Sequence, residues 1–164
     1  MSIEVLEESG AAVDVTRLEK LSRFVLDRLR VHPQAQLCLM LVDEDTIARI
    51  NEEWMGKEGP TDVLAFPIDE LRPGLVNEEP EDGSVLGDLA ICPQVAARQA
   101  EDAAAGGAVG YTVTDELELL TVHGILHLLG FDHAEPEEHA EMFGLQARLL
   151  AEWGAERTGR SVEA

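Results

Sequence analysis

The sequence of 164 residues has the length of one domain, and its hydrophobic content of 45% is sufficient for a buried core. Its formal net charge of −21 disfavours a general nucleic-acid-binding surface, because phosphate binding usually needs a basic footprint. No apolar run approaches the ~20 residues of a membrane span, the first residues lack a signal-peptide pattern, and Cys38 and Cys92 are too few for a disulfide framework. We therefore expect a cytoplasmic protein with reduced thiols.

The first part of the chain alternates short apolar runs with amphipathic segments, which is typical of interleaved strands and helices. Residues 43–54 carry acids in their first turn, where negative charge complements the helix dipole. The predicted elements are, in chain order, a strand at 3–7, a helix at 16–30 capped by Asp14 or Thr16, a strand at 35–42, a helix at 43–54 and a strand at 63–66.

The predicted helix at 16–30 carries a concentration of basic residues that is unusual for so acidic a chain. It holds five of the twelve lysines and arginines, namely Arg17, Lys20, Arg23, Arg28 and Arg30. One interpretation is a solvated helix face with Glu19 and Asp27 as local partners. The other is a local patch that faces an anion.

The second part of the chain begins with a segment rich in proline, glycine and acids, which predicts a long surface loop over 67–84. The predicted elements that follow are a strand at 85–92, a helix opened by Pro93 and ending at 105, a helix at 115–129 capped by Thr114 and ended by Gly130, and an amphipathic helix at 136–153. The fold class is therefore α/β (α+β): a single domain over 1–154 with one four-stranded mixed sheet and about five helices, and a loose C-terminal tail at 155–164.

The segment HGILHLLGFDH, residues 123–133, predicts a metal site. His123 and His127 are one helical turn apart, so both imidazoles can reach one ion. Gly130 permits a left-handed turn that returns His133 to the same place. Three hydrogen-bonded core histidines are the alternative, but this spacing favours a metal. Three imidazoles without a thiolate leave a coordination position open, and they suit zinc, or nickel and other divalent ions.

The residue after the first histidine separates two classes of metal enzyme. The spacing of the histidines is also that of the metzincin proteases, which place a glutamate there as general base. This chain has Gly124 instead, which argues against a peptidase. A glycine inside a helix costs about 1 kcal/mol relative to alanine, so we expect a substrate or a neighbouring segment to approach the backbone at this point.

Three ordered segments resemble the motifs of the YbeY family of bacterial rRNA maturation factors and metal-dependent endoribonucleases. They are HGILHLLGFDH at 123–133, NEEWMGKEGPTDVLAFP at 51–67 and LGDLAIC at 86–92, and the resemblance spans most of the chain. It implies a small α/β domain with a metal bound in a cleft by His123, His127 and His133. It also implies processing and quality control of ribosomal RNA, notably at the 3′ end of small-subunit rRNA, with small-subunit proteins and an assembly GTPase as further partners.

One position departs from the family pattern. The family carries an arginine after the aromatic residue of the second motif, and this chain has Met55 there. Lys57 is the cation that remains nearby, although a lysine lacks the bidentate fork of an arginine. Trp54, just before, either stacks on a base or packs against the protein.

We predict His123, Asp132 and Lys57 as catalytic residues. Asp132 either carries a proton or orients a ligand histidine. Weaker candidates for the cleft are Asp62, Asp88 and His139. Water or the RNA 2′-hydroxyl could be the attacking group, and the sequence leaves both open.

The predicted function is a metal-dependent single-strand-specific endoribonuclease. The alternatives are another zinc-dependent hydrolase, such as a peptidase with a displaced base, and a non-catalytic ribosome-assembly factor. Gly124 counts against the peptidase, and the open coordination position counts against the assembly factor.

Overall fold

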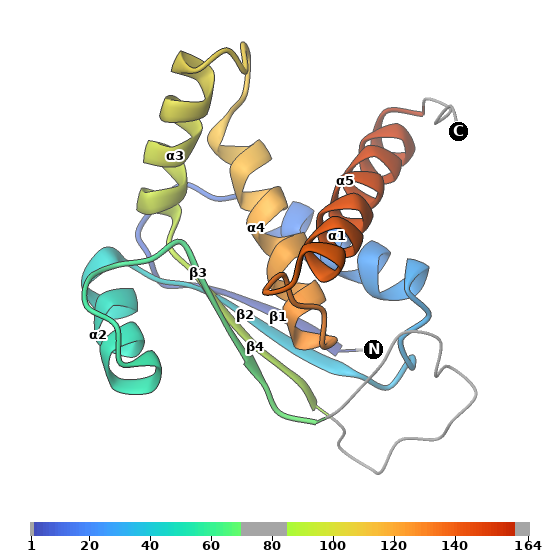
Figure 1. Cartoon of the computed structure of the whole chain (residues 1–164), viewed down its shortest axis with the longest axis horizontal. Coiled ribbons are helices and arrows are strands. Elements are labelled where there is room, and N and C mark those ends of the chain that lie inside the picture. The colour runs from blue at the N-terminus through green and yellow to red at the C-terminus, as the bar shows by residue number, and fades with distance from the viewer. Residues whose placement is uncertain (1, 70–84, 160–164) are drawn as a thin grey trace.

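The computed structural model describes residues 2–69 and 85–159, which form four strands and five helices (Figure 1). The elements are β1 (Ser2–Glu7), α1 (Val15–Arg28), β2 (Gln36–Leu41), α2 (Glu44–Met55), β3 (Val63–Pro67), β4 (Val85–Ile91), α3 (Pro93–Ala105), α4 (Val113–Leu128) and α5 (Pro136–Thr158). Each lies on a segment for which the sequence predicts the same type of element.

The strands form one mixed sheet in the order β1-β2-β4-β3. β1 pairs with β2 and β2 with β4 in parallel, and β3 pairs with β4 in the antiparallel sense at the edge. The predicted mixed sheet is therefore confirmed. Most of the predicted loop at 67–84 lies outside the described residues, although Pro67 ends β3 and Asp69 still accepts a hydrogen bond from the Val85 backbone.

The two faces of the sheet carry different helices. The larger cluster of buried residues joins Leu89 and Ile91 of β4 to α1, α4 and α5, and it is mostly aliphatic, as the composition indicates. The smaller cluster joins Ala90 of β4 to Ile47 of α2. Because neighbouring residues of a strand point to opposite faces, α2 covers the face opposite to α4 and α5 (Figure 1).

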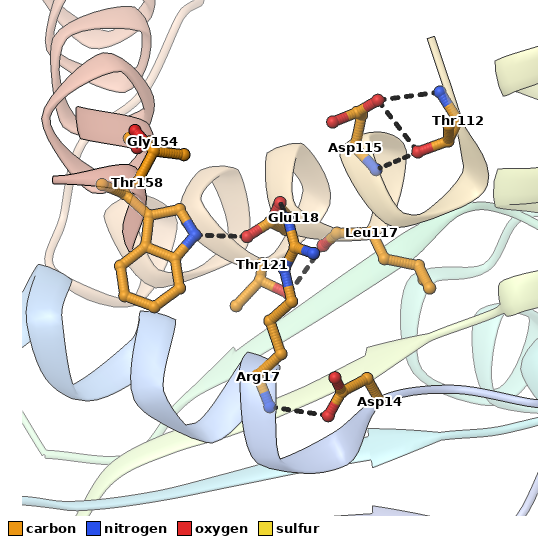
Figure 2. Close-up of polar contacts among 10 residues, drawn as sticks. Asp14, Arg17, Thr112, Asp115, Leu117, Glu118, Thr121, Gly154 and Thr158 are labelled. Atoms are coloured by element: carbon orange, nitrogen blue, oxygen red, sulfur yellow. Dashed lines mark hydrogen bonds and ion pairs between the residues drawn. The ribbon is translucent and has the colours of Figure 1, made fainter. Parts of the chain in front are cut away.

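The helix α4 lies at the centre of the larger layer, as predicted from its apolar circumference. Most of its side chains are buried, and it contacts α1, α3, α5, β3 and β4. The predicted cap at Thr114 is wrong, because Thr112 caps the helix. The Asp115 N–H donates to Thr112 Oγ1 (3.2 Å) and the Thr112 N–H donates to Asp115 Oδ2 (2.8 Å), which is a capping box (Figure 2).

The helix α5 continues beyond its predicted end at 153 and ends at Thr158, where Gly159 adopts the left-handed conformation. Residues 155–158 are thus helical instead of part of a loose tail. Gly154 does not stop the helix, because the buried Leu149 and Trp153 hold this part of α5 against the core. No helix in the described ranges is long and apolar enough to cross a membrane.

Candidate metal centre

The three histidines of the motif come together at the C-terminal end of α4. One ring nitrogen from each lies within 4.8 Å of the others, and the Nε2 atoms of His123 and His127 are 3.2 Å apart. Gly130 has a φ of 95°, and the next N–H, that of Phe131, donates back to the Leu126 carbonyl. This reversal brings His133 to the helix end, as predicted.

The second nitrogen of His123 has its own partner. Nδ1 lies 2.8 Å from Oε1 of Gln146, a buried side chain of α5. His123 therefore directs one nitrogen toward α5 and the other toward the histidine cluster.

The surroundings of His127 favour its neutral form. Burial is the largest effect that lowers its pKa, followed by the neighbouring His123 and His133. Asp132 and a hydrogen bond with the Phe131 backbone oppose the shift only in part. A neutral imidazole is the form that binds a metal, so this environment suits a ligand.

Two aromatic side chains of α5, Phe143 and His139, lie next to the histidine cluster. The Phe143 ring centroid lies 5.7 Å from that of His123 and 5.8 Å from that of His133. His139 is exposed but stacks on Phe143 at 4.3 Å, and its ring lies 6.2 Å from that of His133. His139 thus stands at the border of the centre.

A cavity of about 240 Å³ adjoins the turn that carries His133. It is lined by Gly130, Phe131, Asp132, Glu138 and Glu141. Asp132 Oδ1 accepts a hydrogen bond of 2.7 Å from the His133 backbone N–H, so it holds the turn rather than a histidine ring.

The donor set fits a divalent ion. Three imidazoles converge and no thiolate is among them, which is the set of a catalytic site with an open position. The residues that would hold the ion are His123, His127 and His133.

Gly124 packs against the sheet. A Cβ atom at this position would stand 2.7 Å from Leu89 Cδ2 and 3.4 Å from Val63 Cγ2. A neighbouring segment is therefore what approaches the helix backbone here. A larger side chain at this position would have to displace Leu89, so the position at which metzincins carry their base faces the sheet in this chain.

The segment that contains Lys57 begins at the end of α2, the helix that covers the face of the sheet opposite to α4. Lys57 follows Gly56, the left-handed cap of α2, and it is exposed. Trp54 is 72% exposed and makes an edge contact with Phe66 of β3, with ring centroids 6.5 Å apart. Met55 is also exposed. The catalytic role of Lys57 remains a prediction.

Two of the basic residues of α1 pair with acidic residues of other helices. Arg17 Nη2 lies 2.8 Å from Glu118 Oε1 of α4 (Figure 2), and Arg28 Nη1 lies 2.9 Å from Glu152 Oε2 of α5. Within α1, Arg23 Nη2 lies 3.4 Å from Glu19 Oε1, so Glu19 is a local partner as predicted. The interpretation as a paired helix face is thus the better one, with further partners that come from other helices.

The two other aspartates proposed for the cleft, Asp62 and Asp88, have contacts with residues outside the histidine cluster. Asp62 accepts hydrogen bonds from the Val63 N–H (2.8 Å) and from Gln99 Nε2 (3.3 Å), which is turn and packing chemistry. Asp88 lies within β4, opposite Phe66 of β3.

Sequence reasoning named His139 of α5 as a candidate but missed Phe143 and Gln146. His139, Phe143 and Gln146 recur at intervals of four and three residues, so they lie on one face of a helix. That spacing next to a histidine motif is the signal that could have indicated them.

Comparison with known proteins gives a consistent result. The sequence profile of the family described as "Endoribonuclease YbeY" matches residues 4–154. The chain is 68% identical over 155 residues to the Endoribonuclease YbeY of a Nocardioides species, covering 94% of this chain and 99% of the relative. It is 58% identical over 153 residues to that of Thermobifida fusca, covering 93% and 94%.

Among solved structures, the solution structure of TM1509 from Thermotoga maritima matches with a TM-score of 0.61 and 30% identity, over 99% of this chain and 96% of that one. The match over nearly the whole chain agrees with the fold described above, and the histidine cluster lies within the segment that the family profile covers. The chain belongs to the endoribonuclease YbeY family.

Proposed function

We propose that this chain is a metal-dependent, single-strand-specific endoribonuclease that acts in the maturation of ribosomal RNA, including the 3′ end of small-subunit rRNA, and in ribosome quality control. The observation that carries the proposal is the convergence of three imidazoles in a member of an endoribonuclease family. Zinc is the proposed ion, because it prefers such nitrogen ligands in a site with an open position, and nickel is the next candidate.

The residues of the centre have separate tasks in this proposal. His123, His127 and His133 hold the ion, which when bound supplies a Lewis acid that polarises a phosphodiester. Asp132 fixes the turn of His133 and borders the cavity beside it, where it can accept or deliver a proton. Lys57 supplies a cation for an RNA phosphate.

Other classes of function have less support. A peptidase of the metzincin type needs a base at position 124, where this chain has a glycine whose Cβ position faces Leu89 of the sheet. A non-catalytic assembly factor has no need of an open coordination position. The proposed partners are ribosomal RNA together with small-subunit proteins and an assembly GTPase, and the proposed location is the cytoplasm.

The deciding experiment compares two substrates. Zinc-loaded protein should cleave single-stranded segments of ribosomal RNA, should leave casein intact, and should lose RNA cleavage when a chelator is added. The His127→Ala variant serves as the control for contaminating nucleases. Cleavage of casein, or RNA cleavage that persists in His127→Ala, contradicts the proposal.

A second experiment tests the segment around Lys57. Met55→Arg should strengthen the binding of single-stranded RNA, and Lys57→Ala should weaken it, with differences that shrink at higher salt because the contacts are electrostatic. If both variants equal the wild type at two salt concentrations, this segment does not face the RNA.

A further inference from the structure

One buried polar side chain outside the histidine motif contacts the cluster. Gln146 of α5 is only 5% exposed, and its Oε1 lies 2.8 Å from Nδ1 of His123. The two residues are 23 positions apart in the sequence, so the docking of α5 on α4 creates this contact.

The atoms of this contact decide which form of His123 is present. An amide oxygen only accepts hydrogen bonds, so the bond requires the hydrogen on Nδ1. The neutral ring then has its lone pair on Nε2, the nitrogen that lies 3.2 Å from Nε2 of His127. The lone pair is therefore on the nitrogen that faces the cluster.

We propose that Gln146 is a positioning residue that holds the Nδ1–H tautomer and the ring orientation of His123, so that Nε2 is ready to bind the metal. This inference rests on the metal site of the proposed function. In metal sites generally, a partner on the second ring nitrogen fixes the tautomer and raises the basicity of the ligand, and its loss costs about 10- to 100-fold in metal affinity.

The packing of α5 holds Gln146 in place. Met142, Leu149 and Trp153 lie on the same face of α5 and are buried in the core. Gln146 lies between these anchors, so the side chain is restricted before any ion arrives and little conformational entropy remains to be lost.

The test uses three variants and the affinity for zinc. Gln146→Met keeps the volume but removes the acceptor, and its zinc affinity should fall about 10- to 100-fold. Gln146→Glu keeps an acceptor and should retain the affinity of the wild type. The matched control is Gln94→Met, because Gln94 is a half-buried glutamine of α3 whose Nε2 donates to the Ser9 carbonyl; this variant should bind zinc as the wild type does.

A second readout needs no variant. Nitrogen NMR of the imidazole rings should show the hydrogen of His123 on Nδ1 in the metal-free wild type. Wild-type zinc affinity in Gln146→Met, an equal loss in Gln94→Met and Gln146→Met, or a hydrogen on Nε2 each overturns the inference. Failure of the metal site itself is distinguishable, because His127→Ala would then bind zinc like the wild type.

Discussion

The polar side chains in the two halves of α4 have opposite kinds of partner. In the N-terminal half, Glu118 accepts hydrogen bonds from Arg17 Nη2 of α1 at 2.8 Å and from Trp153 Nε1 of α5 (Figure 2). In the C-terminal half, His123 and His127 direct the same type of nitrogen at each other, and His133 joins them. One half pairs unlike groups, and the other gathers like groups.

This difference separates a structural network from a candidate metal-binding site. The carboxylate of Glu118 meets a cation and an indole N–H, so its charge is compensated within the protein and ties three helices together. Burial, and then the neighbouring His123 and His133, lower the pKa of His127 and so disfavour its protonation. The lone pairs of the three neutral rings would find a partner in a cation bound between them.

The largest expected effect is the loss of zinc in His127→Ala. Zinc sites in small domains bind with roughly 10–16 kcal/mol, so the loss of one of three protein ligands should weaken zinc binding at least about a hundred-fold. At the same zinc concentration, zinc should raise the melting temperature of the variant less than that of the wild type, because the stabilisation depends on the affinity. Titration with a chelator of known affinity checks the loss of affinity, and an equal zinc-dependent shift in both proteins contradicts the expectation.

A substitution in the N-terminal half of α4 should change the stability of the fold rather than its affinity for zinc. Glu118→Ala leaves Arg17 and Trp153 without their acceptor, and the side chains of Glu118 and Arg17 are only 7% and 25% exposed. We expect the free energy of unfolding to fall by about 2–4 kcal/mol, with the zinc-dependent rise in melting temperature retained.

The control for Glu118→Ala is an exposed ion pair. Arg148 is 77% exposed and pairs with Glu152 within α5 at 3.0 Å, so Arg148→Ala should cost at most about 1 kcal/mol. Urea denaturation of both variants checks the contrast. Equal costs for the two would contradict the view that Glu118 joins the helices.

A smaller effect is expected at Gly124, in the C-terminal half of α4, where the helix packs against the sheet. In Gly124→Ala the new methyl group meets the buried Leu89, and overpacking of about 1–3 kcal/mol exceeds the gain in helix propensity of about 1 kcal/mol. Gly144→Ala is the matched control, since no atom lies within 4 Å of the new Cβ, and it should stabilise the protein by about 0.5–1 kcal/mol. Thermal unfolding of both variants tests the prediction, and equal stabilisation in both would contradict close packing at Gly124.

The local order of α4 follows from the sequence, whereas the partners of its two halves do not. The turn between His123 and His127 and the reversal at Gly130 depend on residues close in the chain, so spacing predicts them. Arg17 and Glu118 are 101 positions apart, and Gln146 reaches His123 only because α5 docks on α4. Such contacts depend on how the helices pack, which periodicity does not specify.

The errors at helix ends have the same origin. Thr112 and Thr114 both resemble caps, and only the reciprocal bonds with Asp115 distinguish them. Gly154 resembles a terminator, but the burial of Trp153 carries α5 past it. Local residue types are ambiguous in both cases, and tertiary contacts decide.

The smallest expected effect is on the pH range of stability. His127, in the C-terminal half of α4, should limit the acid end, and Tyr111, which precedes α4 and bonds to Glu116 of its N-terminal half, should limit the alkaline end. Burial, then His123 and His133, lower the pKa of His127 from 6.5. Below this value the unfolded chain binds more protons than the folded chain, so the metal-free protein should lose stability as the pH falls.

Burial, then the hydrogen bond to Glu116, raise the pKa of Tyr111 from 10. The folded chain keeps this proton after the unfolded chain has lost it, so stability should decline as the pH rises above 10.

Two variants separate these limits. His127→Gln should flatten the acid side of the stability profile alone, and Tyr111→Phe, which also removes the 2.8 Å bond to Glu116, should flatten the alkaline side alone. Urea denaturation of metal-free protein between about pH 5 and pH 11 measures both slopes. If either variant changed both slopes, the two halves of α4 would be coupled through the helix. The division between a network closed within the protein and a site open to a cation would then not hold.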